Sequence, residues 1–256
     1  MVPYILCSAV LIFIYMTGLF LVALARKDNS LADIGWGIGF ILVTALGFYL
    51  EPGWTSRHIL VAGLVFIWGL RLALHILLRN RKRGEDFRYA KWREDWGKRF
   101  VLRSYLQVFL LQGAILLVIS YSIMVVDHSP DPGLTPLDAA GFAVWLLGFF
   151  FEAVGDRQLQ TFKRDPANKG RIIMSGLWKF TRHPNYFGEA AMWWGLFLIA
   201  LSVENGWTAV ISPVAITFML LRVSGVTMLE KKYRGNREFE EYAKTTSAFI
   251  PWFPKK

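Results

Sequence analysis

Charge and cysteine are both scarce in this sequence. Only 19% of its 256 residues are Asp, Glu, Lys or Arg, whereas 54% are hydrophobic and the mean hydropathy is +0.37. Water-soluble domains carry about a quarter charged residues, so the composition argues against that class. The single cysteine, Cys7, excludes an intramolecular disulfide, and its place in the first apolar run indicates an inert thiol that is packed or faces lipid.

Several motifs that would identify a chemistry are also missing. The sequence contains no Gly-x-Gly-x-x-Gly, no phosphate-binding loop and no Gly-x-Ser-x-Gly. A dinucleotide would therefore have to bind without a Rossmann domain, and serine hydrolysis has no motif to support it. The histidines and Cys7 lack the spacing of metal ligands, so we predict no metal site.

Long apolar runs are what the sequence has in abundance. A helix needs about 20 mostly apolar residues to cross a bilayer. Seven stretches meet or approach this length: residues 3–25, 31–50, 58–79, 104–126, 137–155, 186–202 and 207–228. No cleavage site follows the first run, so we expect it to be retained as a helix. We predict an all-α integral membrane protein with about seven transmembrane helices in one bundle, forming a single membrane domain over residues 1–256.

Positive charge alternates along the chain and predicts the topology. Two Lys or Arg lie at Arg26-Lys27, ten in residues 79–103, seven in residues 156–185 and eight from Arg222 onward. The other two of the 29 basic residues are Arg57 and Arg71. The positive-inside rule then places the N-terminus outside and the C-terminus in the cytoplasm. The net charge of +10 thus reflects topology and contacts with anionic membrane lipids, and it does not indicate nucleic-acid binding.

Ionisable residues within or next to the spans are the first candidates for function. Asp33 lies near the start of the second span and Arg71 within the third, and such groups either carry function or pair with each other. The connection over residues 79–103 holds Glu85, Asp86, Arg88 and Tyr89, followed by three aromatic residues. This pattern fits an amphipathic interfacial helix, a site that faces the cytoplasm, or both.

The connection over residues 156–185 ends in the most informative motif of the chain, just before a long apolar run. The motif reads Arg182-His183-Pro184-Asn185-Tyr186-Phe187-Gly188-Glu189. Pro184 favours the first turn of the helix that follows, and Arg182 and His183 supply donors suited to phosphate or carboxylate. Upstream polar residues include Asp156, Lys163 and Asn168. Such a mixture of functional groups indicates a pocket for a ligand with several functional groups.

From Asp156 to Glu189 the chain resembles the C-terminal domain of the membrane steroid 5α-reductase family, above all its bacterial branch described as DUF1295. The tail is similar too, with Glu241-Tyr242 followed by Phe249-Ile250-Pro251. The strong resemblance covers residues 150–254. It implies a seven-helix bundle that binds NADPH from the cytoplasmic side and reduces a carbon–carbon double bond conjugated to a carbonyl.

The resemblance also implies roles for individual residues. Their positions match cofactor contacts of the family: Asp156, Lys163, Arg182, His183, Asn185, Glu189 and Tyr242. Asn168 and Tyr186 belong to the same polar segment and complete the predicted cofactor-binding set. For the substrate oxygen we expect donors from Tyr89 and from a protonated Asp33, because stabilising the developing enolate lowers the barrier.

Two features keep other functions open. The characterised reductases resemble one another in a Gln-Glu pair on the second helix. This chain has no Gln-Glu dipeptide, so a lipid other than a steroid stays open as the substrate. Isoprenylcysteine and phospholipid methyltransferases resemble the chain at Arg-His-Pro-x-Tyr, where they bind S-adenosylmethionine. They carry a Glu-Glu pair where this chain has Glu230-Lys231.

The leading hypothesis is therefore an NADPH-dependent reductase of a steroid-like or other lipid, located as a multi-pass protein in a bacterial inner membrane. The first alternative is a lipid or isoprenylcysteine-type methyltransferase that uses S-adenosylmethionine. The second is a transporter or scaffold without catalysis, which explains the sorted charges but leaves the mixed polar segment without a role. We expect membrane lipids and a small lipid substrate as partners, with no obligate protein partner.

Overall fold

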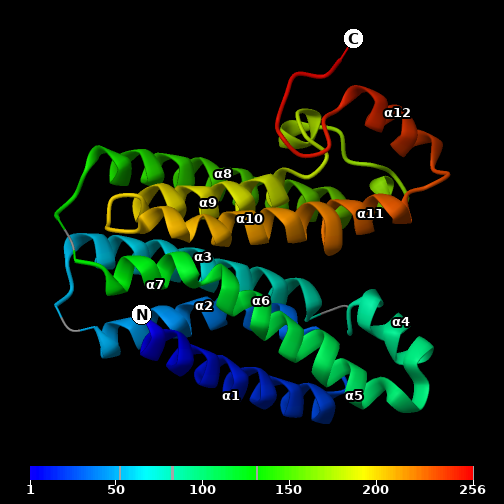
Figure 1. Cartoon of the computed structure of the whole chain (residues 1–256). Helices are drawn as coiled ribbons and strands as arrows, with labels where there is room; N and C mark the ends of the chain where they lie inside the picture. Colours follow the sequence, from blue (N-terminus) through cyan, green and yellow to red (C-terminus); the bar gives the residue numbers. More distant parts are fainter. Residues whose placement is uncertain (52, 82–83, 131, 256) are drawn as a thin grey trace. The chain divides into compact units, whose positions relative to one another are not determined.

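A computed structural model describes residues 1–51, 53–81, 84–130 and 132–255, and these residues form helices joined by turns and loops (Figure 1). Six helical segments within them are long and apolar enough to cross a membrane: Val2–Arg26, Leu31–Leu50, Ser56–Asn80, Phe87–Ile119, Pro136–Arg164 and Gly206–Lys232. The protein is thus an all-α, multi-pass membrane protein, as its composition predicts.

The helix boundaries differ from the predicted spans most clearly at the fourth, fifth and sixth spans. The fourth, predicted over residues 104–126, falls in the long segment Phe87–Ile119 and the separate helix Tyr121–His128. The segment predicted over residues 186–202 forms α9 (Pro184–Ala200), a helix of 17 residues that begins at Pro184 as expected. It is shorter than the six long segments, so the count of seven spans stays a prediction, as does the orientation of the termini. The fifth span was predicted to end at residue 155, but α8 (Pro136–Arg164) continues to Arg164. Asp156 therefore lies on a helix and not at the start of a loop.

The described chain forms two compact units, residues 1–134 with 202–211, and residues 135–201 with 212–255. We describe each unit by itself, and the single membrane domain stays a prediction. The elements of the first unit are α1 (Val2–Arg26), α2 (Leu31–Leu50), α3 (Ser56–Asn80), α4 (Phe87–Trp96), η1 (Gly97–Arg99), α5 (Phe100–Ser104), η2 (Tyr105–Leu110), α6 (Leu111–Ile119), α7 (Tyr121–His128) and η5 (Gly206–Val210).

In the first unit, α2 packs directly on α3 through glycine. A Cβ added at Gly37 would lie 2.3 Å from the carbonyl oxygen of Gly69, so the two backbones touch there. Phe40 and Trp68 fill the adjoining core, with ring centroids 5.4 Å apart. Residues 79–103 contain the helix α4, where Tyr89 is the buried residue, and its amphipathic interfacial character stays a prediction.

The second unit contains α8, η3 (Pro166–Asn168), η4 (Gly176–Lys179), α9, α10 (Ile211–Phe218), η6 (Met219–Val223), α11 (Val226–Lys232) and α12 (Arg237–Thr245). Its centre is the antiparallel pair of α8 and α9 (Figure 1). Glycines spaced seven residues apart face each other along this pair, Gly141 opposite Gly195 and Gly148 opposite Gly188. A Cβ at Gly188 would lie 2.4 Å from the carbonyl oxygen of Gly148. Seven residues make about two helical turns, so the glycines keep one face of each helix free of side chains.

We predict that Gly188→Ala destabilises the protein, although alanine is the better helix former. The added methyl group meets backbone atoms of α8 and must push the helices apart, which costs about 1–3 kcal/mol. Thermal unfolding in detergent measures the loss. Gly63→Ala on α3 is the matched control, because its Cβ would meet nothing within 4 Å. Equal melting temperatures for the two variants would contradict the close packing.

Candidate functional site

The first cluster of polar side chains lies in the first unit, around Asp33 in the first turn of α2. Arg88 donates from Nη2 to Asp33 Oδ2 at 2.6 Å, and the Tyr89 hydroxyl donates to Asp33 Oδ1 at 2.6 Å. Both carboxylate oxygens thus accept a hydrogen bond, and the ion pair is largely buried, with the Arg88 and Asp33 side chains 23% and 16% exposed. The structure brings together Asp33 and Tyr89, the two residues predicted to act on the substrate.

The start of α4 fixes the position of Arg88 and Tyr89. Asp86 caps the helix by accepting from the Arg88 backbone N–H at 3.0 Å, and it also accepts from Arg88 Nε at 2.8 Å. Burial on its own would raise the pKa of Asp86, but the hydrogen bonds and charge of Arg88 hold it below its usual range. The backbone N–H of Asp86 donates to Ser30 Oγ, which ties this turn to the start of α2.

Hydrogen-bond directions around Tyr89 follow from its single hydroxyl hydrogen. Because that hydrogen goes to Asp33, the Tyr89 oxygen accepts from Gln112 Nε2 at 3.3 Å. The other amide atom, Gln112 Oε1, is buried and has no hydrogen-bond partner among the described residues. Tyr89 itself is 2% exposed. The result is an ordered chain of donors that points from Gln112 through Tyr89 to Asp33.

A second cluster lies in the second unit, where α8 meets the start of α9. A Cβ at Gly155 would lie 3.1 Å from Pro184, so the helix ends approach closely. Asn185 in the first turn of α9 then donates from Nδ2 to Asp156 Oδ1 on α8 at 3.1 Å. Asp156 is buried, and Glu189 lies half-buried one turn beyond Asn185. Asp156 and Asn185, two residues of the predicted cofactor set, are therefore in contact at this helix junction.

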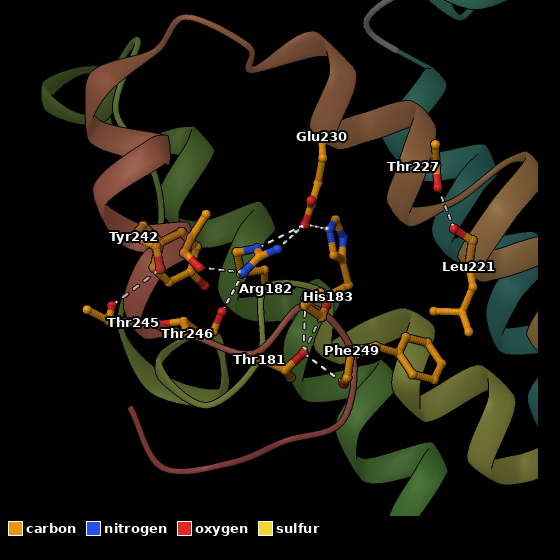
Figure 2. A network of polar contacts seen from close by, with 12 residues as sticks. Thr181, Arg182, His183, Leu221, Thr227, Glu230, Tyr242, Thr245, Thr246 and Phe249 are labelled. Carbon is orange, nitrogen blue, oxygen red and sulfur yellow. Dashed lines mark hydrogen bonds and ion pairs between the residues drawn. The ribbon is translucent and has the colours of Figure 1, made fainter. Parts of the chain in front are cut away.

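Arg182 joins three segments of the second unit (Figure 2). Its Nε and Nη2 donate to Glu230 Oε1 of α11 at 2.9 and 2.8 Å. Its Nη1 donates to the carbonyl oxygens of Ala243 and Thr246 at the end of α12. The donors that we expected to face a ligand thus go to protein acceptors in this structure. The backbone of Arg182 also pairs with the tail, through N–H to the Ser247 oxygen at 2.9 Å.

His183 and Tyr242 flank Arg182. His183 is 5% exposed, pairs through Nε2 with Glu230 Oε1 at 3.2 Å, and stacks on the Tyr186 ring with centroids 5.6 Å apart. The Tyr242 hydroxyl donates to the carbonyl oxygen of Trp178. Burial raises the pKa of Tyr242 well above its usual range, with Arg182 acting against this rise, so the phenol stays neutral.

Two further residues of the predicted cofactor set lie near the end of α8 or just after it. Lys163 is exposed near the end of α8. Asn168 donates from Nδ2 to the carbonyl oxygen of Phe162 at 3.1 Å, which closes the turn that follows α8. Their roles as cofactor ligands stay predictions.

Sequence reasoning left two residues of these clusters without a role in a site: Gln112 and Glu230. The signal for Glu230 was present, because it stands where methyltransferases carry a Glu-Glu pair. Gln112 gave no signal, since a single amide in an apolar run looks like a tolerated polar residue. Among the described residues, no group of three His, Cys, Asp or Glu side chains is placed to hold a metal ion.

Comparison with known proteins identifies the family. The family model described as "Protein of unknown function (DUF1295)" matches residues 19–246. The chain belongs to the DUF1295 family. No solved structure matches the chain significantly.

This DUF1295 protein is also similar to curated relatives named 3-oxo-5-alpha-steroid 4-dehydrogenase 1. The Mus musculus protein is 30% identical over 117 residues, which are 46% of this chain and 43% of the relative. The Homo sapiens protein is 30% identical over 125 residues, 49% of this chain and 45% of the relative. A probable O-methyltransferase of Ustilaginoidea virens is 39% identical over 51 residues, 20% of this chain and 18% of the relative. The chain thus matches less than half the length of these relatives.

We predict that Arg182→Lys loosens the C-terminal tail. A lysine ammonium cannot reach Glu230 and two carbonyl oxygens in the geometry of a guanidinium, so the free energy of unfolding should fall by about 1–3 kcal/mol. Thermal unfolding and tryptic cleavage after Lys244 measure the effect. Arg171→Lys is the control, because Arg171 is exposed. Equal stability and cleavage in both variants would show that Arg182 does not hold the tail.

Proposed function

We propose that this DUF1295 protein is a membrane reductase that uses NADPH to reduce a carbon–carbon double bond conjugated to a carbonyl in a steroid-like or other lipid. The contact between Asp156 and Asn185 carries the proposal. It brings Asn185, which lies in the Arg182–Glu189 motif, together with Asp156, which lies upstream of the motif, at one helix junction. The similarity to 3-oxo-5-alpha-steroid 4-dehydrogenase 1 supports the same reaction class.

The donor set of the second unit fits a dinucleotide phosphate. A guanidinium and an imidazole suit phosphate oxygens, while the Asn185 amide and the Asp156 and Glu189 carboxylates suit amide and hydroxyl groups. Asp156 and His183 are buried, so hydrogen bonds to a ligand would be shielded from water. With the positive-inside orientation, these residues face the cytoplasm, where NADPH is present.

Bound at these residues, NADPH would supply the hydride for the β-carbon of the enone. The Tyr89 hydroxyl turns its hydrogen from Asp33 toward the substrate oxygen as negative charge develops there. Asp33 acts as an acceptor that positions Tyr89, because Arg88 already pairs with it at 2.6 Å. Gln112 donates to the Tyr89 oxygen and holds the ring in place while the hydroxyl hydrogen changes direction. A proton from water at the α-carbon would complete the reduction.

The methyltransferase alternative keeps one supporting observation, the short match to a probable O-methyltransferase. It would need Arg182 to bind the carboxylate of S-adenosylmethionine. The ligand that the purified protein binds, NADPH or S-adenosylmethionine, distinguishes the two functions.

Calorimetric titration of the detergent-solubilised protein with NADPH, NADH and S-adenosylmethionine tests the proposal. We expect NADPH to bind, and Asn185→Ala to weaken its affinity about tenfold or more, since a hydrogen-bonded polar ligand contact is lost. Gln160→Ala is the control, because Gln160 lies on α8 one turn after Asp156 but outside the predicted cofactor set. Binding of S-adenosylmethionine without NADPH would overturn the reductase and favour the alternative.

We predict that Tyr89→Phe lowers kcat/KM for reduction of a 3-oxo steroid with a conjugated double bond by about a hundredfold or more, because one donor to a developing oxyanion is lost. NADPH affinity should not change. Tyr105→Phe is the matched control, since Tyr105 lies in the same unit and bonds Thr17 at 3.1 Å. A fall of equal size in both variants would remove Tyr89 from the mechanism.

A further inference from the structure

Three N–H donors of the second unit converge on one oxygen atom. Arg182 Nε, Arg182 Nη2 and His183 Nε2 lie 2.9, 2.8 and 3.2 Å from Glu230 Oε1 (Figure 2). The other oxygen of the carboxylate, Oε2, makes no hydrogen bond to the described residues. Three donors aimed at a single oxygen form the arrangement that binds one oxygen of a phosphate or carboxylate ligand.

These donors also have contacts other than Glu230. The guanidinium is held through Nη1 by the carbonyl oxygens of Ala243 and Thr246. The His183 backbone N–H donates to Thr181 Oγ1, and its ring stacks on Tyr186 with an interplanar angle of 12°. The donors around the anion position are therefore also anchored by groups other than the carboxylate now in it.

Glu230 has weaker attachments than the donors it contacts. Its side chain is 26% exposed, and it lies on α11, a helix of seven residues. This helix follows Gly225, where a Cβ would lie 2.1 Å from the Leu220 carbonyl oxygen, so only glycine permits the turn. Thr227 Oγ1 donates to the Leu221 carbonyl oxygen at 2.7 Å, so this bond spans Gly225 and anchors the start of α11. Withdrawal of Glu230 would therefore use its own side-chain torsions and the part of α11 beyond Thr227.

We propose that Glu230 occupies the position of a nucleotide phosphate oxygen and leaves it when the nucleotide binds. The inference rests on the proposed function and adds to it a displaceable carboxylate and a movement of α11. Charge explains why an exchange is required. Arg182 is only 10% exposed, so removing Glu230 without a replacement would leave a nearly buried cation unpaired. A ligand phosphate replaces one anion by another.

The first experiment compares Glu230→Gln with wild type in titrations with pyrophosphate, NADPH and dihexanoyl phosphatidic acid. A neutral amide competes less for the donors, so we expect pyrophosphate and NADPH to bind about tenfold more tightly to the variant, because a larger fraction of the protein is ready to bind. Glu241→Gln is the matched control, with the same charge change on an exposed residue that pairs with Lys244. Its affinities should equal those of wild type.

Unchanged or weaker binding of all three anions to a folded Glu230→Gln protein would overturn the inference. If only dihexanoyl phosphatidic acid binds more tightly, the displaceable carboxylate stands, the phosphate comes from a lipid, and the cofactor in the proposed function is wrong. The two proposals thus fail in different ways.

A second experiment uses the wild-type protein and does not depend on the folding of a variant. Hydrogen–deuterium exchange over residues 224–232 should become faster when saturating pyrophosphate or NADPH releases Glu230. Slower or equal exchange in this segment, with either anion shown to be bound, would mean that Glu230 stays on Arg182 and would contradict the inference.

Discussion

The contact between the backbones of α8 and α9 is the constraint on which the second unit depends. Glycines at a spacing of seven residues let the helices approach until a Cβ at Gly148 would lie 2.5 Å from the Gly188 oxygen. Such closeness fixes the register of the antiparallel pair, because sliding by one residue would place a side chain against a backbone. That register sets Asp156 opposite Asn185. The polar junction is thus a consequence of apolar packing several turns away.

In both polar clusters the arginine is paired with a carboxylate of its own cluster. Arg88 lies between Asp33 and Asp86, and Arg182 pairs with Glu230. Such pairing is expected where chains enter a membrane, since an unpaired ion next to hydrocarbon is costly. It also means that neither arginine offers its charge freely. A ligand gains affinity there only by taking the place of a carboxylate or by accepting a hydrogen that a carboxylate now holds.

Much of this arrangement could be predicted from the sequence, for reasons that can be named. Apolar runs predicted the positions of most helices, and Pro184 indicated the start of α9 because its backbone suits a first turn. The end of α8 was missed, since polar residues after 155 read as a loop although Arg, Gln and Leu favour a helix. Glu230 and Gln112 were missed as site residues because their partners lie 47 and 23 positions away in the chain. Separations of that size follow from tertiary packing, which local patterns do not encode.

The single hydrogen on the Tyr89 hydroxyl has a consequence for which ligands this cluster would favour. Any other oxygen that accepts this hydrogen bond must compete with Asp33, whose Oδ1 lies 2.6 Å from the Tyr89 oxygen. A neutral carbonyl is a weaker base than a carboxylate and competes poorly. An enolate is a far stronger base and would take the hydrogen. The cluster therefore discriminates by basicity and not by shape, and it would hold a charged intermediate more firmly than the molecule from which that intermediate forms.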